Sequence, residues 1–429
     1  MKRSALVSGL ALILSAGPAF ATICTIDAVP AGTLLLPYFE VDLNNPNGLT
    51  TLFSVNNANK HTALAHAIIW SDLAVPVLDF NIYLTGYDVQ SVNLRDIIVN
   101  GNLPQTAPLS EDPNDTISPR GPLSKDGDYP GCQGVLPPPA LPSFLTAYLQ
   151  AALTGQPVAI VHGNCAGQAL GDNIARGYIT VDMVTDCSTK FPGDAGYFSA
   201  DGTGDVDNVR NHLWGDWMIV NSAQNFAEGG TLVAIESDTI NPATSTPGNY
   251  TFYGRYDNWT AIDYREPLAT TFGTRFLNGG PFSGGTSLLV WRDPKVPQTF
   301  FTCPATPGTQ PPWYALGQEL VAIFNEQENV LEPVTSPNSP LPAIGSFAPF
   351  PAATQRVQVG GASLPVPYSF GWLWLDLNTT VAPAGSNPPI DPAASQAFVF
   401  STLESNGHFA VGIEAIRLDS ACAANHAVP

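Results

Sequence analysis

Apolar and polar residues alternate with a period of two along much of the chain. In residues 78–84, Leu, Phe, Ile and Leu alternate with Asp, Asn and Tyr. Because neighbouring side chains of a β-strand point to opposite faces, this pattern predicts a strand with one apolar face. Comparable runs occur at 33–42, 50–55, 63–70, 158–162, 176–183, 213–220, 231–235, 250–256, 287–291, 320–325, 370–377, 397–402 and 409–417. The sequence therefore predicts an all-β protein.

One segment has the spacing of an amphipathic helix instead. Its apolar stripe consists of Phe144, Leu145, Tyr148, Leu149 and Leu153. Ser143 stands where an N-cap belongs, and Gly155 follows the stripe as a stop signal. We expect one short helix that packs on the edge of a sheet.

Proline-rich segments divide the strands into groups. Ten prolines lie between residues 102 and 142, and further proline-rich loops run over 304–312, 333–351 and 383–392. Proline cannot donate to a sheet ladder, so these segments lie outside the sheets. We predict two β-sandwich units, Ig-like or jelly-roll-like, at 22–102 and 143–429. The segment 103–142 joins them as a linker or long loop, and later strands are free to cross back into the first unit.

The first 21 residues have the three parts of a secretory signal peptide. Lys2 and Arg3 precede an apolar stretch over 5–16, and Ala19-Phe20-Ala21 forms a small-x-small cleavage site. No later run of 18 apolar residues exists, so the sequence predicts no transmembrane helix. We expect an exported protein of a Gram-negative bacterium, located in the periplasm, on the cell surface or in the medium.

Export determines how the six cysteines are interpreted. An even number of cysteines without a CxxC spacing favours disulfides over zinc in an oxidising compartment. The cysteines are Cys24, Cys132, Cys165, Cys187, Cys303 and Cys422. Sequence alone does not choose among their pairings. As working hypotheses, we pair Cys165 with Cys187 across one hairpin and Cys24 with Cys422 at the chain ends.

Charge and composition exclude some classes of partner. Only 12% of the residues are charged and 44% are hydrophobic, so the chain has enough apolar surface to fold. The net charge is −20, and loss of the signal peptide would make it more negative, because Lys2 and Arg3 would be removed. Nucleic acid is therefore excluded as a partner, because phosphate binding requires clustered Lys and Arg.

An acidic, glycine-containing segment is a candidate calcium site. Calcium prefers six to eight oxygen ligands, which alternate positions of a flexible loop can supply. The candidate ligands are Asp201, Thr203, Asp205 and Asp207. The EF-hand pattern is broken, because Val206 replaces the required Gly and His212 replaces the bidentate Glu. A solvated acidic loop is the alternative that we favour, and calcium is the one cofactor that the sequence suggests.

Arginine is concentrated in one aromatic stretch of this arginine-poor chain. Arginine beside aromatic and acidic residues can hold a sugar or an anionic group by stacking and paired hydrogen bonds. The candidate binding residues are Tyr253, Arg255, Asp257, Trp259, Arg265 and Arg275. Because the charges of this stretch nearly cancel, we favour the alternative that these arginines form ion pairs within the sheet.

Two pairs of tryptophans are candidates for saccharide stacking. Trp372 and Trp374 are two residues apart and share one face of a strand, whereas Trp214 and Trp217 share a face only if a bulge intervenes, for example at Gly215. Exposed pairs would form stacking platforms for sugars, and buried pairs would belong to the core. Because tryptophan usually buries a large area, we expect them in the core.

No motif of a known catalytic class is present. The sequence lacks a GxSxG elbow, an HExxH helix and a glycine-rich phosphate loop before a helix. The favoured function is therefore binding, without catalysis, of a polysaccharide or another cell-surface component. A secreted hydrolase of polysaccharides, with Glu40 and Asp42 as one candidate carboxylate pair, is the first alternative. An outer-membrane β-barrel is the second.

Overall fold

The structure is a computed structural model. It describes residues 28–106, 129–199, 204–237, 251–256, 263–294, 296–306, 311, 316, 320–331, 349–378, 396–406 and 408–419. The predicted signal peptide, most of the proline-rich segments, and the candidate residues Cys24, Cys422, Asp201, Thr203, Asp257 and Trp259 lie outside these ranges.

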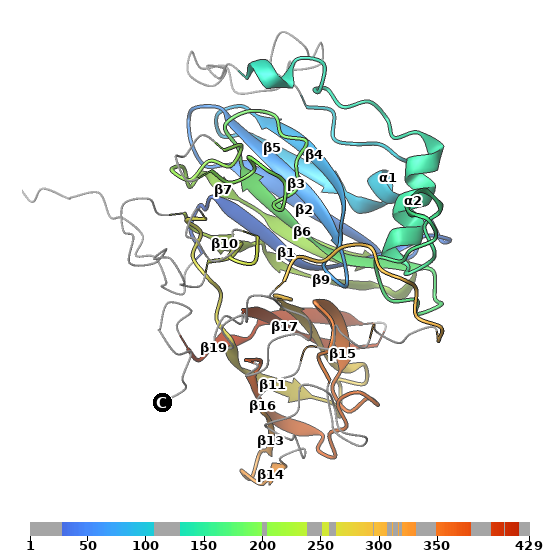
Figure 1. Ribbon diagram of the computed structural model, residues 1–429. Coiled ribbons are helices and arrows are strands. Elements are labelled where there is room, and N and C mark those ends of the chain that lie inside the picture. Colours follow the sequence, from blue (N-terminus) through green and yellow to red (C-terminus); the bar gives the residue numbers. More distant parts are fainter. Residues whose placement is uncertain are drawn as a thin grey trace, which may run out of the picture.

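The protein has an all-β, sandwich-like fold built from four antiparallel sheets. The first sheet contains, in spatial order, β10 (Val233–Ile235), β1 (Thr33–Asp42), β6 (Ile174–Met183), β3 (Ala63–Ser71) and β4 (Pro76–Leu84). The second contains β5 (Val89–Asn93), β2 (Thr50–Asn57), β8 (Asp216–Asn221) and β9 (Phe226–Thr231), with β7 (Leu213–Trp214) paired to β2. These two sheets form the upper part of the molecule in Figure 1.

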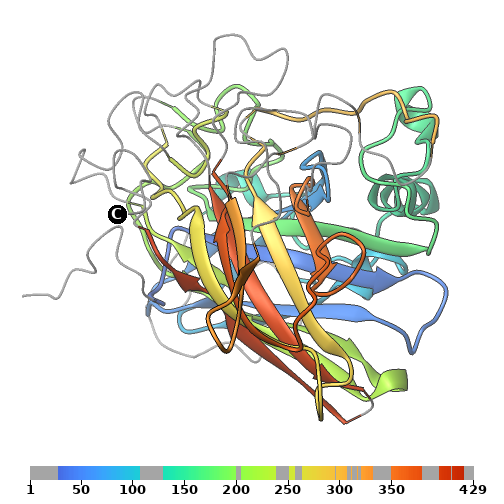
Figure 2. The same cartoon turned by 90° about the horizontal axis from the view of Figure 1, so that it is seen from below.

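The remaining two sheets form the lower part (Figure 1). The third sheet contains β15 (Thr354–Gln358), β12 (Gly285–Arg292), β17 (Ala397–Ser405) and β18 (Phe409–Glu414). The fourth contains β14 (Val330–Leu331), β13 (Leu320–Asn325), β16 (Phe370–Asp376), β11 (Thr271–Leu277) and β19 (Ile416–Arg417). In the view from below, these strands lie in front of the first two sheets (Figure 2).

The central strands of the third sheet, β12 and β17, are buried on both faces. Leu289, Trp291 and Phe400 of this sheet belong to the main core, which also contains the inner side chains of the first two sheets. Leu288 and Val290 alternate with them and pack against the fourth sheet in a second core. The period-two alternation of β12 therefore supplies side chains to two cores at once.

In the described ranges, two α-helices and three single-turn 3-10 helices accompany the sheets. The α-helices are α1 (Leu94–Ile98) and α2 (Ser143–Leu153), and the 3-10 helices span Pro130–Cys132, Ala159–Val161 and Ser222–Gln224. Ser143 is the first residue of α2 and not its cap, because Pro142 occupies the N-cap position and no side chain caps the helix. Within the described chain, no helix is long and apolar enough to cross a membrane.

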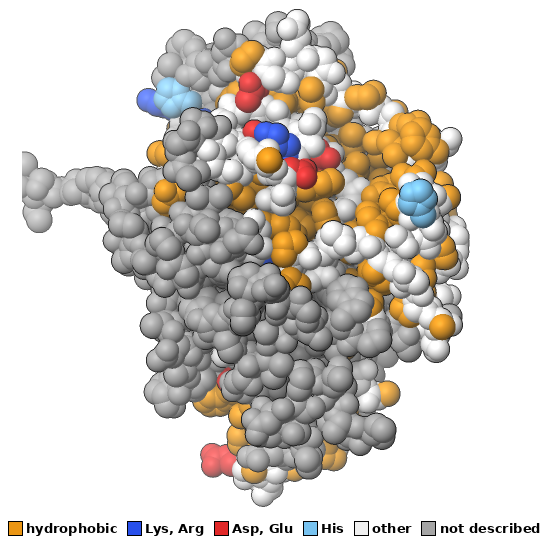
Figure 3. All heavy atoms as spheres, viewed as in Figure 1, with side chains coloured by type: hydrophobic (Ala, Val, Ile, Leu, Met, Phe, Trp, Pro, Cys, Tyr) orange, Lys and Arg blue, Asp and Glu red, His pale blue; other side chains and the backbone are white. Residues whose placement is uncertain are grey.

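The helix α2 packs against the first sheet. It contacts β4, β6 and α1, and its Leu149 and Leu153 are buried. Phe144, in contrast, is 59% exposed. Hydrophobic side chains accordingly reach the surface over α2 on the right-hand side of Figure 3. The predicted apolar stripe is therefore only partly buried.

Strands from both sides of the predicted linker share the first two sheets. β6 and β10 pair with β1, and β8 pairs with β2, although these partners are separated in sequence by the segment 103–142. The described part of the early chain therefore does not form a separate sheet. Its strands interleave with those that follow the linker.

Two predicted strands are wrong. Residues 158–162 contain the 3-10 helix Ala159–Val161. In the described residues of 250–256, successive turns join Gly254 N to Thr251 O and Tyr256 N to Tyr253 O. These turns are stabilised because Tyr253 and Arg255 reach buried acceptors from them, as described below. The sequence also missed β5, β9, β11, β14, β15 and α1, which are short or have mixed polarity.

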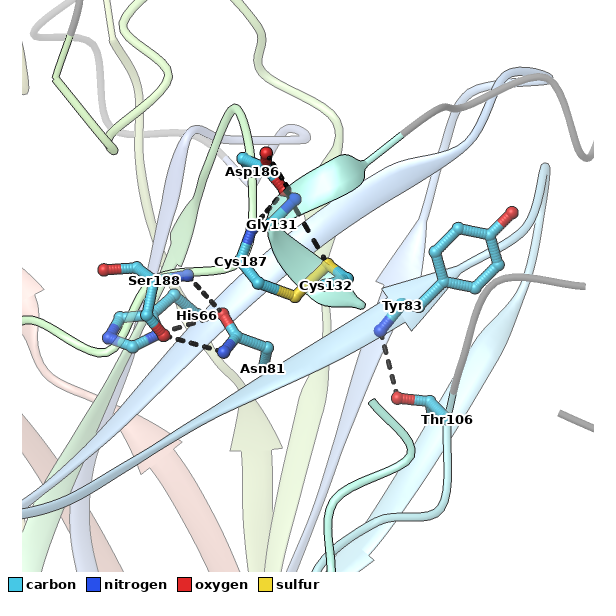
Figure 4. The surroundings of a disulfide bond; sticks show 9 residues. All are labelled: His66, Asn81, Tyr83, Thr106, Gly131, Cys132, Asp186, Cys187 and Ser188. Carbon is cyan, nitrogen blue, oxygen red and sulfur yellow. Dashed lines mark hydrogen bonds between the residues drawn. A yellow bond between two sulfur atoms is a disulfide. The ribbon is translucent and has the colours of Figure 1, made fainter. Parts of the chain in front are cut away.

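The disulfides differ from the predicted pairing. Cys132 bonds to Cys187 (Figure 4), and Cys165 bonds to Cys303. The predicted Cys165–Cys187 bond is wrong, because these residues lie beyond opposite ends of the ten-residue strand β6. Such a strand is about 33 Å long, whereas disulfide-bonded Cα atoms lie within about 7 Å. The pair Cys24–Cys422 lies outside the described residues.

The Cys132–Cys187 bond lies beside a hydrogen-bonded histidine (Figure 4). His66 is fully buried, with Nδ1 3.1 Å from Asn81 Oδ1 and Nε2 3.0 Å from the Lys190 carbonyl oxygen. Both ring nitrogens therefore have partners within the chain. This arrangement is that of a structural histidine in the core.

Candidate functional site

The structure separates the arginines of the predicted binding stretch. Arg255 and Arg265 are 4% and 0% exposed, whereas Arg275 lies on the surface. The Arg255 guanidinium forms a buried ion pair with Asp293 and lies 4.7 Å from the centre of the Tyr256 ring. Arg255 therefore links the turns of 251–256 to the end of β12, inside the protein.

The second buried arginine belongs to a network around Asp182. Thr33 Oγ1 donates to Asp182 Oδ1 at 2.5 Å, and the hydroxyls of Tyr197 and Tyr253 donate to Oδ2 at 2.5 and 2.9 Å. Arg265 Nε lies 3.5 Å from Oδ1 and donates to Thr33. Burial, together with the nearby carboxylate, raises the pKa of both tyrosines well above the ordinary value. Both therefore remain hydrogen-bond donors, which suits a structural network.

Arg275 is part of an exposed aromatic face. On β16, Leu373 and Leu375 point into the second core, so Trp372 and Trp374 point outward and are 44% and 37% exposed. The prediction that this pair lies in the core is wrong. The Arg275 guanidinium lies 4.6 Å from the centre of the Trp372 ring, a cation–π distance. We call Arg275, Trp372 and Trp374 the tryptophan face.

The cross-strand neighbours give the two tryptophans different surroundings. Trp372 lies between Arg275 on β11 and Phe324 on β13, so its ring is flanked on both sides. Trp374 lies between Gly273 and Ala322, which have little or no side chain. Successive outward residues of a strand are about 7 Å apart. The face therefore offers one ring between two large neighbours and one ring between two small ones, with the Leu418 side chain next to Gly273.

The other tryptophan pair does not form a platform. β7 ends at Trp214 and β8 begins at Asp216, so Gly215 interrupts the strand between them. Trp214 is 46% exposed, whereas Trp217 is 3% exposed and packs against Phe400. The two rings therefore lie on opposite sides of the sheet, and the core prediction is correct only for Trp217.

Arg275 has an unsatisfied hydrogen-bonding capacity. Every other arginine in the described part of the chain donates to a carboxylate, a hydroxyl or a backbone carbonyl. Among the residues that the structure describes, Arg275 contacts only Trp372 through its guanidinium. Its guanidinium, with five N–H donors, is therefore available to a ligand on the same face as the two rings.

The described part of the candidate calcium site already has partners. Asp205 accepts from Ser188 Oγ at 2.7 Å and from Lys190 Nζ at 2.8 Å. Asp207 accepts from the backbone of 209 and 210 and forms an ion pair with Arg210. No group of three metal-ligating side chains occurs among the residues described. Because Asp201 and Thr203 lie outside those residues, calcium stays a prediction.

Glu40 and Asp42, the candidate carboxylate pair of the hydrolase alternative, have separate structural roles. Glu40 is 5% exposed and forms ion pairs with Arg356 at 2.9 Å and Arg176 at 3.5 Å. Asp42 accepts from the backbone N–H groups of Asn44 and Asn45 in the following turn. Glu40 is therefore part of a buried ion-pair cluster, and Asp42 stabilises a loop.

No known protein provides a functional assignment. The chain matches no protein-family model, no curated protein and no solved structure. The candidate sites therefore rest on the geometry of this chain alone.

Sequence reasoning missed a second surface feature, an open groove between the second sheet and β18. Its apolar residues include Leu52 and Met218 on neighbouring strands and Val411 on β18. The only signal in the sequence is an outward apolar residue on each short strand. That signal does not show that the strands lie together.

Proposed function

We infer that this protein is an exported, non-catalytic binding protein whose tryptophan face holds a polysaccharide of the cell surface. The observation that carries the proposal is the pair of exposed rings, Trp372 and Trp374, next to an arginine without a polar partner. Large exposed aromatic side chains are costly in water and mark interaction sites. Sugar rings have apolar C–H faces that stack on tryptophan and hydroxyl groups that need donors.

The geometry favours an extended sugar chain over a single enclosed sugar. The face is the outer surface of an antiparallel sheet, and its two tryptophans lie about 7 Å apart along β16, so successive sugars of a chain can contact both. Arg275 is held in place by Trp372, so little side-chain entropy is lost when its N–H groups bind hydroxyl or carboxylate oxygens. The two disulfides are compatible with an oxidising compartment and support export.

Affinity electrophoresis in gels that contain a soluble polysaccharide tests this proposal. We compare wild type, the double variant Trp372→Ala/Trp374→Ala, and Trp214→Ala, which removes an equally exposed tryptophan from another sheet. We expect at least one neutral or uronate-containing polysaccharide to retard wild type and Trp214→Ala but not the double variant. Equal mobility of all three proteins in every gel contradicts the proposal, and release of reducing sugar by wild type contradicts the absence of catalysis.

A further inference from the structure

A second site is present on a different sheet from the tryptophan face. A groove of about 770 Å³ lies between the outer face of the second sheet and the strand β18. This volume falls within the range of about 300–1,000 Å³ that is typical of small-molecule sites. The groove is formed by strands that are distant in sequence, so it exists only because the third sheet packs beside the second.

Glycines allow the strands that border the groove to pack closely. Gly229 on β9 pairs with Met218, and a Cβ atom there would lie 2.2 Å from the Trp217 carbonyl oxygen and 3.0 Å from the Met218 Cα atom. A Cβ atom on Gly412 of β18 would lie 2.2 Å from the Phe400 ring and 3.1 Å from the Gly229 carbonyl oxygen. β9 and β18 therefore approach closely through bare backbone, and the wall of the groove is formed without side chains at these positions.

The floor of the groove has an apolar row and a polar row. Leu52 and Met218 pair across β2 and β8 and are 37% and 46% exposed. Ser54 and Asp216 form the next outward row, with Ser54 Oγ donating to Asp216 Oδ1 at 2.6 Å. Two residues along a strand span about 7 Å. A ligand that covers both rows needs a polar group about 7 Å from an apolar body.

The charged residues that line the groove indicate whether the polar group of the ligand is positive or negative. They are Asp96, Asp216 and Glu228, and none of the described residues that line the groove is Lys, Arg or His. Glu228 is neutralised by Arg356. Asp216 accepts from Ser54 and Asp96 accepts from Asn100, both uncharged, and neither carboxylate has an ion-pair partner in the described structure. Two uncompensated negative charges therefore face an open apolar groove.

We propose that this groove binds a small amphiphilic cation. The apolar body of the ligand lies against Leu52, Met218 and Val411, and its ammonium group lies beside Asp216. Burial of three half-exposed apolar side chains supplies the attraction, because apolar surface removed from water contributes about 25 cal/mol per Å². The carboxylate disfavours an anionic amphiphile of the same length, because it would be placed beside a like charge.

Isothermal titration calorimetry with octyltrimethylammonium, below its micelle concentration, tests the site. We expect saturable binding of one cation per chain and weaker binding of octanoate, which has the same chain length and the opposite charge. We expect Asp216→Asn to weaken binding about two- to fivefold, as is usual for a partly exposed charge pair. Met218→Lys, which places a cation in the groove, should abolish binding.

The matched control is Glu326→Gln, which removes an exposed carboxylate from the turn between β13 and β14. It should bind the cation like wild type. Equal affinity for octanoate, equal loss in Glu326→Gln and Asp216→Asn, or no saturable binding overturns the proposal. A dimer that Met218→Lys dissociates, without cation binding by wild type, would assign the groove to a second copy of the chain. Because the tryptophan face lies on another sheet, Trp372→Ala/Trp374→Ala should leave cation binding unchanged.

Discussion

Arg356 Nη2 lies 2.9 Å from Glu40 Oε2, although 316 residues separate the two in sequence. The same guanidinium forms an ion pair with Glu228, whose side chain is 0% exposed and also accepts from Thr402. Glu40 lies on β1, Glu228 on β9 and Arg356 on β15. One arginine therefore joins the first, second and third sheets at a buried junction.

Loss of this arginine should be far more costly than loss of an arginine whose carboxylate partner is exposed. We expect Arg356→Met to lower the free energy of unfolding by about 3–5 kcal/mol, because two buried carboxylates lose their shared cation. Arg417→Met is the control, since its partner Glu414 is 42% exposed and such a pair contributes at most about 1 kcal/mol. Urea denaturation of both variants measures the difference, and similar losses in the two would contradict a structural role for the junction.

Acidification should reduce the loss of stability that Arg356→Met causes. Burial raises the pKa of Glu40, but Arg356, Arg176 and the hydrogen bond from the Tyr38 hydroxyl together outweigh burial and hold the pKa of this carboxyl below its ordinary value of 4.5. A lowered folded-state pKa stabilises the protein above the unfolded pKa, and this contribution is lost as the pH falls through the folded value. The stability gap between wild type and Arg356→Met should therefore narrow below pH 4.5. A gap that is constant from pH 7 to pH 3 would contradict this account.

The period-two pattern was sufficient to predict the all-β class and most strands, because alternation is a local property of the chain. It was not sufficient to predict all the partners of buried charges. Arg265 pairs within its own stretch as expected, with Nη1 3.6 Å from Asp263 Oδ1. It also donates to Thr33, 232 residues away, and lies 3.5 Å from Asp182. Such partners are brought together only when strands from distant parts of the chain enter neighbouring layers.

Asp72 should make the protein less stable at neutral pH than in mild acid. Burial raises the pKa of this carboxyl to about 7, although Gln168 N–H donates to it and Arg176 lies nearby. The folded state therefore binds more protons than the unfolded state between pH 4 and pH 7, so this group lowers stability as the pH rises through that interval. Asp72→Asn removes the penalty and should gain stability relative to wild type at pH 8, by up to about 4 kcal/mol.

The same substitution near pH 4 is the internal control for Asp72. There the wild-type carboxyl is already protonated in the folded protein, so Asp72→Asn should have little effect on the unfolding midpoint. Denaturation curves of wild type and Asp72→Asn at pH 4 and pH 8 show whether the stability gain depends on pH. A gain that is the same at pH 4 and pH 8 would show that packing, and not ionisation, is responsible.

The two disulfides should contribute unequally to stability. Cys165–Cys303 closes 138 residues and Cys132–Cys187 closes 55. Removal of a native disulfide usually lowers the free energy of unfolding by about 2–5 kcal/mol. In the chain-entropy model, the disulfide that closes the longer loop stabilises the protein by about 0.8 kcal/mol more than the other. We expect Cys165→Ala/Cys303→Ala to unfold at lower urea concentration than Cys132→Ala/Cys187→Ala. The reverse order would show that native-state contacts, not loop closure, control the difference.

The tryptophan face shows why a site residue can be predicted while its site is not. The spacing of Trp372 and Trp374 predicted a shared side of one strand, which the structure confirms. Whether that side is buried depends on where the third sheet packs, and it covers the side of Leu373 and Leu375 instead. Arg275 was proposed together with Arg255 and Arg265, but only a surface arginine without a polar partner is available to a ligand.

Arg275 should contribute affinity without contributing stability. Replacement by Met keeps an unbranched apolar chain beside Trp372 and removes the N–H donors, and a charge-assisted hydrogen bond is worth about 1.5–3 kcal/mol. We therefore expect Arg275→Met to weaken polysaccharide binding roughly 10- to 100-fold, with an unfolding midpoint close to that of wild type. Arg417→Met, on the neighbouring strand β19, should bind like wild type. Measurement of retardation against polysaccharide concentration gives the affinities. If Arg275→Met binds as tightly as wild type while Trp372→Ala/Trp374→Ala does not, the ligand interacts with the rings alone, and the guanidinium serves only to support Trp372.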